Sequence, residues 1–552
     1  MSFLLPVLIV HGLFWCAASD ITVSTNVGNI TGSIEDVSVG PNIVRISTYL
    51  GIPFAEPPVA KLRFAKPVPK AKFADTFLAN KGYAASCLQF APYMHLKIQN
   101  EDCLYLNVFS PKIFENDKKY AVIVWVHGGG FVAGSGSTRT NAILAAYGQV
   151  VLVTLNYRLG PFGFLDTGGN DGSPNNGLWD QHLGIQWVKN NIGSFGGDST
   201  NITIAGQSAG SAAVMFQAIY PGNEGLFQRV IAESGSVNAP WVIVTDPSEK
   251  LRTFTSLMNC PTTSIEGVSC LKALDARAIA QKGAVSFTPG VPQWGPAIDD
   301  DFLTENRLQA LNLPIGKIIL PHFKKLDLLM GTARFDGVVM LSSGPLYAAK
   351  STDELKKALD QLLTRRLGLL FGENISRAIH DDVLSQYENF EDPLNRDVYF
   401  RKAVDFATDI AFFVATYSAL ENHAYNNKIS KTYQYEFNQQ NPLGQYETWS
   451  QNDLVCVECT LNHISLSIYF RNPNKAVSTT SDVFWETYDS QTKKYIYLQS
   501  GEIQMRNNLN RRRTEFWTNY LPGLIKRYSA LNHITNTGIH KTHIGAGILI
   551  GR

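Results

Sequence analysis

Residues 201–220, NITIAGQSAGSAAVMFQAIY, join a short β-rich run to a stretch with the composition of a helix. Ser208 stands at the junction, in the pattern G-x-S-x-G. A tight turn there would bring strand and helix so close that a Cβ at Gly206 or Gly210 would clash. It would also project the serine hydroxyl from the carboxyl end of the strand, near the positive end of the helix dipole. The stretch therefore predicts strand, sharp turn and helix, with Ser208 as a candidate nucleophile.

Short β-rich runs alternate with helical periodicity on both sides of this junction. Helices are expected near residues 176–192 and from Ala209, and Ser351 begins a capping box before another helix. This alternation is typical of a parallel sheet with covering helices. The expected fold class is therefore α/β, with a large, mostly parallel central sheet flanked by helices and with helical insertions. The β-rich runs are residues 120–126, 150–157, 201–206, 229–235, 325–331 and 431–437.

The composition is that of a globular protein. The 552 residues are 45% hydrophobic and 17% charged, which leaves enough apolar surface to bury a large core. There are 48 basic and 47 acidic side chains, so no overall field favours binding to a phosphate polymer. Nucleic acid is therefore not an expected partner. The one dense basic run, Arg511 to Arg513, is expected to be a solvated face.

The N-terminal residues MSFLLPVLIVHGLFWCAAS form an apolar stretch of signal-peptide length, with small residues near Ala18 and Ser19 suited to cleavage. Residues 1–19 are therefore expected to be a signal peptide that directs the protein to the secretory-pathway lumen or the extracellular space. The stretch lacks lysine and arginine, and His11 interrupts it, so an uncleaved anchor stays open as the alternative. No other stretch predicts a stable membrane span.

Seven cysteines are present, and Cys16 belongs to the expected signal peptide. The spacing of the other six suggests three short loops, and export favours disulfides over free buried thiols. Asn29 and Asn374 begin candidate glycosylation sequons, whereas the sequon at Asn201 abuts an expected buried strand. The six cysteines are Cys87, Cys103, Cys260, Cys270, Cys456 and Cys459.

The sequence HGGGF at 127–131 follows an apolar strand and can supply donors for an oxyanion. Successive glycines let backbone N–H groups turn toward a ligand without obstruction by side chains. The expected donors of this oxyanion hole are Gly129, Gly130 and the N–H of Ala209. HGGG upstream of a G-x-S-x-G turn is a specific pairing for acyl transfer.

Several further stretches resemble the type-B carboxylesterase and cholinesterase family of α/β-hydrolases. They are EDCLYLNVFSP at 101–111, NNGLWDQHLGIQWVKNNIGSFGGDSTNITIAGQSAG at 175–210, ESGS at 233–236, GPAIDDDFL at 295–303 and EFWTNYLP near the end. The resemblance covers essentially the whole mature chain and implies a single α/β-hydrolase domain over residues 20–552. It also implies disulfides Cys87–Cys103 and Cys260–Cys270, and catalysis without a cofactor. Cys456 and Cys459 have no counterpart, and a local disulfide, a metal site or a redox site stays open for them.

The family pattern also points to an acid and a base. The family's acid follows a strand in a pattern that, in LLMGTARFDGVVM at 328–340, places Asp336 at that position. The family's histidine lies eight positions before a phenylalanine, but His463 lies seven before Phe470. Two interpretations stay open: one residue is deleted after His463, which then serves as the base, or the base is lost.

Two departures from the family pattern concern the substrate. Gln207 replaces the glutamate that usually precedes the nucleophile, which removes a charge that could attract a cation. The segment between Cys87 and Cys103 lacks the tryptophan by which cholinesterases hold quaternary ammonium. Acetylcholine is therefore not an expected substrate. Phe131 and Trp294 are candidates to line an apolar acyl pocket, and core packing explains them equally well.

Two functions from different classes follow. The first is a secreted serine carboxylic-ester hydrolase that acts through an acyl-enzyme on small, uncharged, apolar esters, with Ser208, Asp336 and His463 as its triad. The second is a cholinesterase-like adhesion or structural glycoprotein that kept the fold and lost turnover. The altered spacing around His463 favours the second, and the intact serine turn and HGGG loop favour the first.

Overall fold

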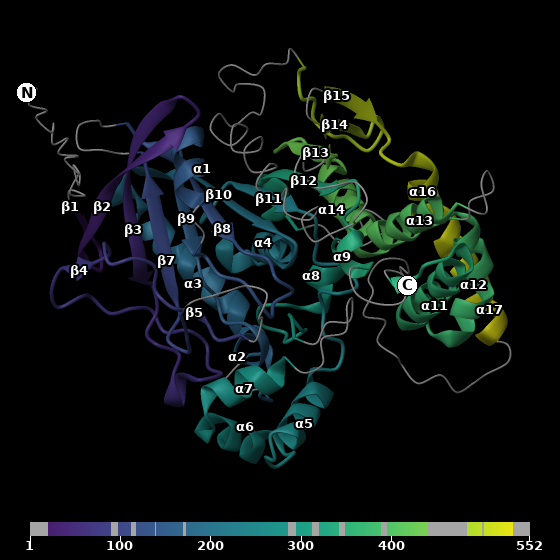
Figure 1. Cartoon of the computed structure of the whole chain (residues 1–552), viewed down its shortest axis with the longest axis horizontal. Helices are drawn as coiled ribbons and strands as arrows, with labels where there is room; N and C mark the ends of the chain where they lie inside the picture. The colour runs from purple at the N-terminus through teal and green to yellow at the C-terminus, as the bar shows by residue number, and fades with distance from the viewer. Residues whose placement is uncertain are drawn as a thin grey trace, which may run out of the picture.

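The computed structural model describes residues 20–89, 98–111, 118–137, 140–168, 173–284, 294–311, 320–341, 348–387, 395–438, 483–499 and 502–533. Its main feature is a sheet of 13 strands that runs through the molecule from the N-terminal strands to the last ones (Figure 1). The strand order is β1-β2-β3-β7-β9-β8-β10-β11-β12-β13-β14-β15, and β4 pairs with β2. The large sheet expected from the sequence is therefore present.

The middle of the sheet is parallel and its two margins are antiparallel, except that the short β4 pairs with β2 in parallel. All pairs from β9 to β14 along the strand order are parallel. The margins are built from hairpin-like neighbours, such as β1 with β2 and β14 with β15. The parallel strands are β8 (Tyr120–Val126), β9 (Val151–Leu155), β10 (Gly197–Gln207), β11 (Arg229–Glu233), β12 (Asp327–Ala333), β13 (Thr432–Phe437) and β14 (Lys494–Gln499). The marginal strands are β1 (Asp20–Thr25), β2 (Gly28–Val39), β3 (Asn42–Pro53), β4 (Phe77–Leu78), β7 (Tyr105–Ser110) and β15 (Glu502–Asn507).

Each face of the sheet has its own apolar cluster. Along β10, Ile204 belongs to one buried cluster and Ala205 to the other, because successive strand residues point to opposite faces. Helix α4 (Ala209–Ile219) packs on the Ile204 face, and α1 (Thr140–Gly148) contributes Leu144 to the opposite cluster. The parallel strands are therefore buried on both faces, as their continuous apolar runs predict.

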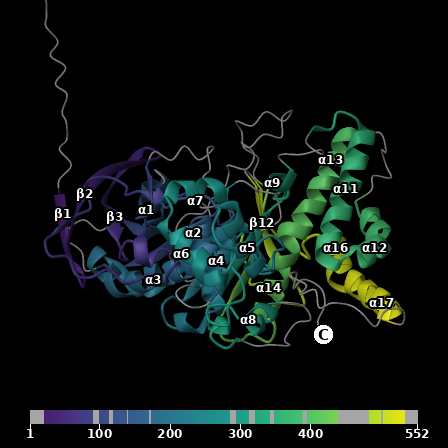
Figure 2. The ribbon, with the colours of Figure 1, turned by 90° about the horizontal axis from the view of Figure 1, so that it is seen from below.

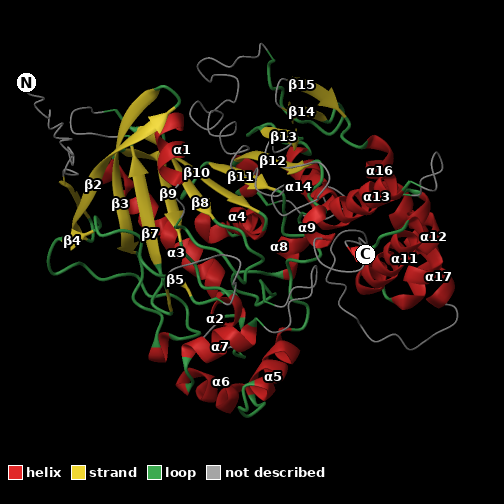
Figure 3. Cartoon of the chain, viewed as in Figure 1, coloured by secondary structure: helices red, strands yellow, loops and turns green. Residues whose placement is uncertain are grey.

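The helices gather in three places around the sheet (Figures 1, 2 and 3). Helix α3 (Asn176–Asn191) lies along the sheet, and its expected apolar face, with Ile185 and Val188, is fully buried. A second group follows β11 in the sequence, and a third follows β12 in the sequence. The second group is α5 (Pro247–Leu257), α6 (Ser264–Ala273), α7 (Ala276–Gly283) and α8 (Glu305–Gln309). The third comprises α9 (Val338–Leu341), α11 (Thr352–Phe371), α12 (Glu373–Ser385), α13 (Arg396–Thr408), α14 (Val414–Ala424), α16 (Arg511–Glu515) and α17 (Leu521–His533). Its α14 packs on β12 and β13, and α11, α12, α13, α16 and α17 lie together at one end of the molecule.

Local signals in the sequence mark several of these boundaries correctly. The Ser351 side chain caps α11 by accepting a hydrogen bond from the N–H of Glu354. The expectation that Arg511 to Arg513 form a solvated face is wrong for Arg513. Its guanidinium is largely buried and forms ion pairs with Asp405 and Asp409, at 2.9 and 2.8 Å. Composition alone could not show this, since both carboxylates come from a distant helical segment.

Among the described residues, one helical stretch, Val398–Ala424, is long and apolar enough to cross a membrane by length and composition. The sequence-based expectation overlooked it. Its apolar window is entirely buried inside the protein, and it carries Asp405 and Asp409, the partners of Arg513. The stretch is therefore explained as a core helix of this fold.

Candidate active site

Ser208 occupies a strained turn between β10 and α4. Its backbone lies at φ 57° and ψ −122°, outside the regions that residues with a Cβ favour. A Cβ at Gly206 would lie 2.4 Å from the carbonyl oxygen of Gly210, and one at Gly210 would lie 2.1 Å from that of Val126. Both glycines are therefore required by close backbone contacts, as the sequence predicts. The side chain of Ser208 stays partly exposed at the end of the strand.

The HGGG loop follows β8, the neighbour of β10, and packs directly on this turn. A Cβ at Gly128 would lie 2.6 Å from the carbonyl oxygen of Gln207 and 3.2 Å from the Cβ of Ser208. Gly129 and Gly130 have φ values of 107° and 63°, which glycine adopts without strain. Among the described residues their N–H groups have no intramolecular acceptor. Ala209 is the first residue of α4, so its N–H also lacks a partner within the helix.

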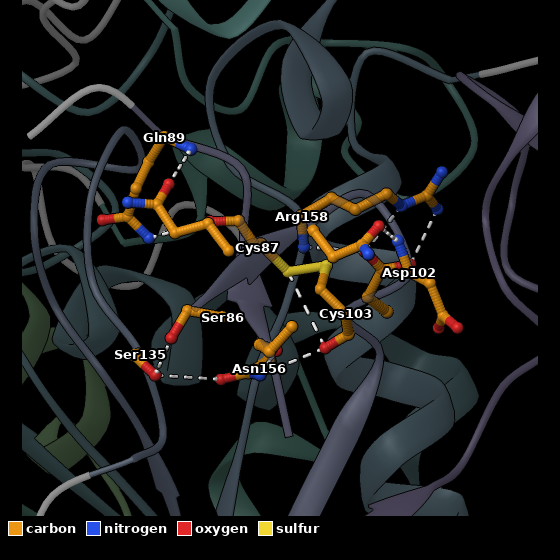
Figure 4. Close-up of a disulfide and its surroundings, with 12 residues drawn as sticks. Ser86, Cys87, Gln89, Asp102, Cys103, Ser135, Asn156 and Arg158 are labelled. Atoms are coloured by element: carbon orange, nitrogen blue, oxygen red, sulfur yellow. Dashed lines mark hydrogen bonds and ion pairs between the residues drawn. A yellow bond between two sulfur atoms is a disulfide. The ribbon is translucent and has the colours of Figure 1, made fainter. Parts of the chain in front are cut away.

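Hydrogen bonds from Gln89 and Asn156, which lie before and after the HGGG loop in the sequence, hold its C-terminal part at Gly134 and Gly136 (Figure 4). Gln89 accepts a hydrogen bond from the N–H of Gly134 and donates one to its carbonyl, each at 2.8 Å. Asn156 accepts from the N–H of Gly136 at 2.9 Å and donates to the carbonyl of Cys103 at 3.1 Å. These contacts connect the loop to the Cys87–Cys103 disulfide. Sequence reasoning did not identify Gln89 or Asn156, since neither belongs to a motif.

Asp336 lies in the turn that follows β12, two strands from β10. Its Oδ2 accepts a hydrogen bond from the N–H of Ala333 at 2.9 Å, and the Ser234 side chain also donates to it. Burial raises the pKa of Asp336 to about 7, although both hydrogen bonds act in the opposite direction. Ser234 itself has φ 55° and follows β11, the strand between β10 and β12. Three adjacent strand ends therefore carry Ser208, Ser234 and Asp336 in order.

The N–H of Ser208 donates to the carbonyl of Glu233 at 2.8 Å, and that of Ser234 donates to the carbonyl of Gly331 at 2.9 Å. These two bonds tie each strand end to the next. The sequence stretch ESGS was noted for its resemblance, but the role of Ser234 as a donor to the acid was missed. The sequence does not show this role, because it depends on the parallel register that brings the end of β11 beside the end of β12.

The sequence that builds these strand ends matches a known family. A family model for the carboxylesterase family matches residues 19–460. The chain belongs to the carboxylesterase family. It is 30% identical to a cholinesterase of Mus musculus over 550 residues, which cover 92% of this chain and 88% of the relative. It is also 30% identical to a bile salt-activated lipase of Bos taurus over 565 residues, covering 94% and 89%. An acetylcholinesterase of Bungarus fasciatus is 28% identical over 550 residues, covering 92% and 88%.

Membership in the carboxylesterase family confirms the recognition made from the sequence motifs and the α/β-hydrolase fold, and it supports ester hydrolysis as the function. The two disulfides that the resemblance implied are present. Cys87 and Cys103 are bonded with a Cα–Cα distance of 4.8 Å, and Cys260 and Cys270 with one of 5.8 Å. Both bonds fit an oxidising compartment. Asn29 and Asn374 are exposed, and their glycosylation stays a prediction.

His463 lies between β13 and β14 in the sequence, outside the described residues, as do Cys456 and Cys459. Two other histidines can be assigned structural roles. His423 is buried in α14, and its ring nitrogens pair with Thr432 and with the carbonyl of Leu326. Burial lowers the pKa of His423 to about 3. A neutral histidine with both nitrogens engaged in the core does not suit a general base.

His127 of the HGGG loop is the second structural histidine. It stacks on Tyr157 with ring centroids 4.4 Å apart, and its Nδ1 lies 2.8 Å from the carbonyl oxygen of Gly128. Burial lowers the pKa of His127 to about 4, so the ring is neutral at physiological pH. A Cβ at Gly134 would lie 2.1 Å from His127 Nδ1. His127 is therefore packed as a support for the glycine loop.

The two candidate pocket residues, Phe131 and Trp294, are both almost fully buried. The Trp294 indole donates to the carbonyl of Gly283 at 2.8 Å and packs edge-on against Phe254. Phe131 packs edge-on against Phe164, with centroids 5.1 Å apart. These contacts show core packing, and a role in the acyl pocket stays a prediction for both.

Among the described residues, no three histidine, cysteine or acidic side chains form a group suited to a metal ion. Backbone N–H donors lie beside Ser208, and the next two strand ends carry Ser234 and the buried Asp336. That set suits acyl transfer by a serine nucleophile, which needs donors for an oxyanion and an activated hydroxyl.

Proposed function

We propose that this protein is a secreted serine carboxylic-ester hydrolase that acts through an acyl-enzyme on uncharged, apolar esters. The observation that carries the proposal is the strained turn at Ser208 with the HGGG loop packed against it. A backbone that holds a non-glycine residue at φ 57° has a cost of about 1–3 kcal/mol, which an ordinary surface serine does not require. The N–H groups of Gly129, Gly130 and Ala209 lie beside this turn without intramolecular acceptors among the described residues.

In the proposed mechanism, His463 removes the proton from the Ser208 hydroxyl as its oxygen attacks the ester carbonyl. Asp336 orients the histidine and stabilises its charged form. The N–H groups of Gly129, Gly130 and Ala209 stabilise the tetrahedral oxyanion. His463 then returns the proton to the leaving alcohol, and the same base activates water to hydrolyse the acyl-enzyme. No cofactor takes part in these steps.

The preference for uncharged esters rests on Gln207. A Cβ placed at Gly128 would lie 2.9 Å from Gln207 Oε1, so this neutral amide lies against the HGGG loop beside the nucleophile. A carboxylate there would attract a cationic substrate, and the amide does not.

A comparison of acetylcholine with its neutral isostere 3,3-dimethylbutyl acetate tests this preference, and we expect the higher kcat/KM for the neutral ester. Gln207→Glu should shift the ratio toward acetylcholine. A preference for acetylcholine in the wild type would overturn the substrate assignment.

Hydrolysis of p-nitrophenyl butyrate by the purified protein tests the function itself. Ser208→Ala should lower kcat by at least about 10⁴-fold, to the level of uncatalysed background, while the fold is retained. His463→Ala should have a similar effect, whereas His380→Ala, at a position on α12, serves as the matched control. Wild-type activity no higher than that of Ser208→Ala would refute the hydrolase.

The second candidate, a cholinesterase-like adhesion or structural glycoprotein, draws on the altered spacing between His463 and Phe470. It predicts a folded, secreted protein with no reaction at Ser208. Labelling with a fluorophosphonate probe separates the two candidates, because a serine activated by a base reacts with this electrophile and an inactive one does not.

A further inference from the structure

Glu233 is a buried carboxyl group that the proposed mechanism does not use. It is the last residue of β11, in register with Gln207 of β10 and Gly331 of β12. Its exposed fraction is 2%, and its Oε1 has no hydrogen-bond partner among the described residues. Alternation along β11 places its side chain on the same face as Ile231, opposite the face that α4 covers. A buried carboxyl beside a candidate catalytic centre calls for a compensating interaction.

The groups that surround Glu233 include only one other described carboxyl. Gln207 on β10 is an amide, and α4 carries no titratable side chain. The turn after β12 contributes Asp336, whose charge raises the pKa of Glu233. Strand β13 contributes the buried Tyr435, whose pKa is raised by both carboxyl groups. Burial raises the pKa of Glu233 to about 8, and the charge of Asp336 contributes in the same direction. Both carboxyl groups are buried, and the charge of Asp336 opposes ionisation of Glu233, so ionising both at neutral pH is unfavourable.

We propose that Glu233 and Asp336 hold one proton between them, which stays on Glu233 while Asp336 is ionised, so that Glu233 is a positioning residue for the acid of the site. The assignment follows from their hydrogen bonds. Asp336 accepts from the Ala333 N–H and from Ser234, which stabilise its charged form. Glu233 Oε1 lacks such donors among the described residues. The proposal rests on the proposed function only for the role of Asp336 as the acid that orients the base.

Thermal unfolding across pH tests the pair without any need for activity. A carboxyl whose pKa is higher in the folded state loses stability as pH rises from its unfolded value, near 4, through its folded value, near 8. Glu233→Gln removes this loss. Its Tm relative to wild type should therefore rise by about 2 °C between pH 5.5 and pH 8.5, measured at one scan rate.

The Asp336→Asn background shows whether the effect belongs to the pair. Without the Asp336 charge, Glu233 ionises more readily, so Glu233→Gln should gain less between the two pH values. Glu421→Gln is the matched control, because Glu421 on α14 is similarly buried but accepts a hydrogen bond from the hydroxyl of Tyr488. Its effect should be the same in both backgrounds. A Glu233→Gln gain that is absent, or equal in both backgrounds, would overturn the shared proton.

Two further readouts cover the remaining outcomes. If Glu233→Gln does not fold, an infrared titration of the wild type should show a neutral carboxyl band that is lost as pH rises through about 8. A titration without such a band contradicts the proposal.

In the hydrolysis assay, the alkaline limb of the pH profile of kcat/KM should move to higher pH in Glu233→Gln, a change that a merely structural role would not produce. If the wild type hydrolyses no ester, the proposed hydrolase function is refuted. The stability and infrared measurements still show whether Glu233 and Asp336 share a proton, because neither depends on activity.

Discussion

The turn that carries Ser208 and the turn that carries Asp336 lie at the ends of strands in one sheet, but different interactions hold them. The Ser208 turn is held by backbone contacts so close that two glycines are obligatory. The Asp336 turn is held by hydrogen bonds that arrive from a neighbouring strand end and from the main chain of its own turn. A steric requirement of this kind can be met only by glycine, so it is visible in the sequence. A hydrogen-bond donor can be any of several residue types, so it is not.

Among the changes that test this contrast between the two turns, Asp336→Asn is expected to have the largest effect. The amide keeps the shape of the turn but removes the charge that would orient His463, so kcat should fall by about 10³- to 10⁴-fold. The measurement is kcat for p-nitrophenyl butyrate, with circular dichroism to confirm the fold. Activity within tenfold of the wild type would show that the acid lies elsewhere.

A Cβ in the Ser208 turn should break it. Gly210→Ala would place a methyl group 2.1 Å from the carbonyl oxygen of Val126, and we expect a loss of about 3 kcal/mol in the free energy of unfolding, with activity lost as well. Gly368→Ala is the control, because a Cβ at that position in α11 meets nothing within 4 Å. Chemical denaturation of both variants measures the difference. Equal stability of the two would contradict the steric account.

Removal of a hydrogen bond should affect the Asp336 turn more mildly. Ser234→Ala takes away a donor that lowers the pKa of Asp336, so that pKa rises and the acid limb of the kcat/KM profile moves to higher pH. We expect about a tenfold decrease in kcat/KM at neutral pH. Ser236→Ala is the matched control, since the Ser236 hydroxyl is buried two residues away without a partner among the described residues. An unmoved acid limb would disprove the role of Ser234.

The smallest expected effect measures the strain at Ser208 itself. Glycine relieves a positive φ and alanine does not, so Ser208→Gly should be more stable than Ser208→Ala by about 1 kcal/mol. Both variants lack the hydroxyl, which removes differences in reactivity from the comparison. The midpoints of urea denaturation, compared at an unchanged m value, show which of the two variants is more stable. A more stable alanine variant would show that the turn is unstrained.

The same contrast explains what the sequence could predict. The parallel strands, α3 and the Ser208 turn follow from apolar runs, helical periodicity and glycine spacing, which are local properties. Ser234, Glu233 and Asn156 were missed because their roles depend on the register between strands or on contacts with remote loops. Arg513 was misassigned for the same reason, since its carboxylate partners lie about a hundred residues upstream. Asp336 was reached through family resemblance; the structure places it in the turn after β12, and its role as the acid stays a prediction.

The strand order of the sheet has a consequence for how the protein matures. The HGGG loop follows β8, the nucleophile follows β10 and the acid follows β12, so their assembly requires pairings between segments far apart in the chain. Such non-local pairings form late and slowly during folding. A chain in which β12 is not yet paired would hold Ser208 without Asp336, the proposed acid. The appearance of esterase activity during refolding would therefore report completion of the sheet, later than signals from helix formation alone.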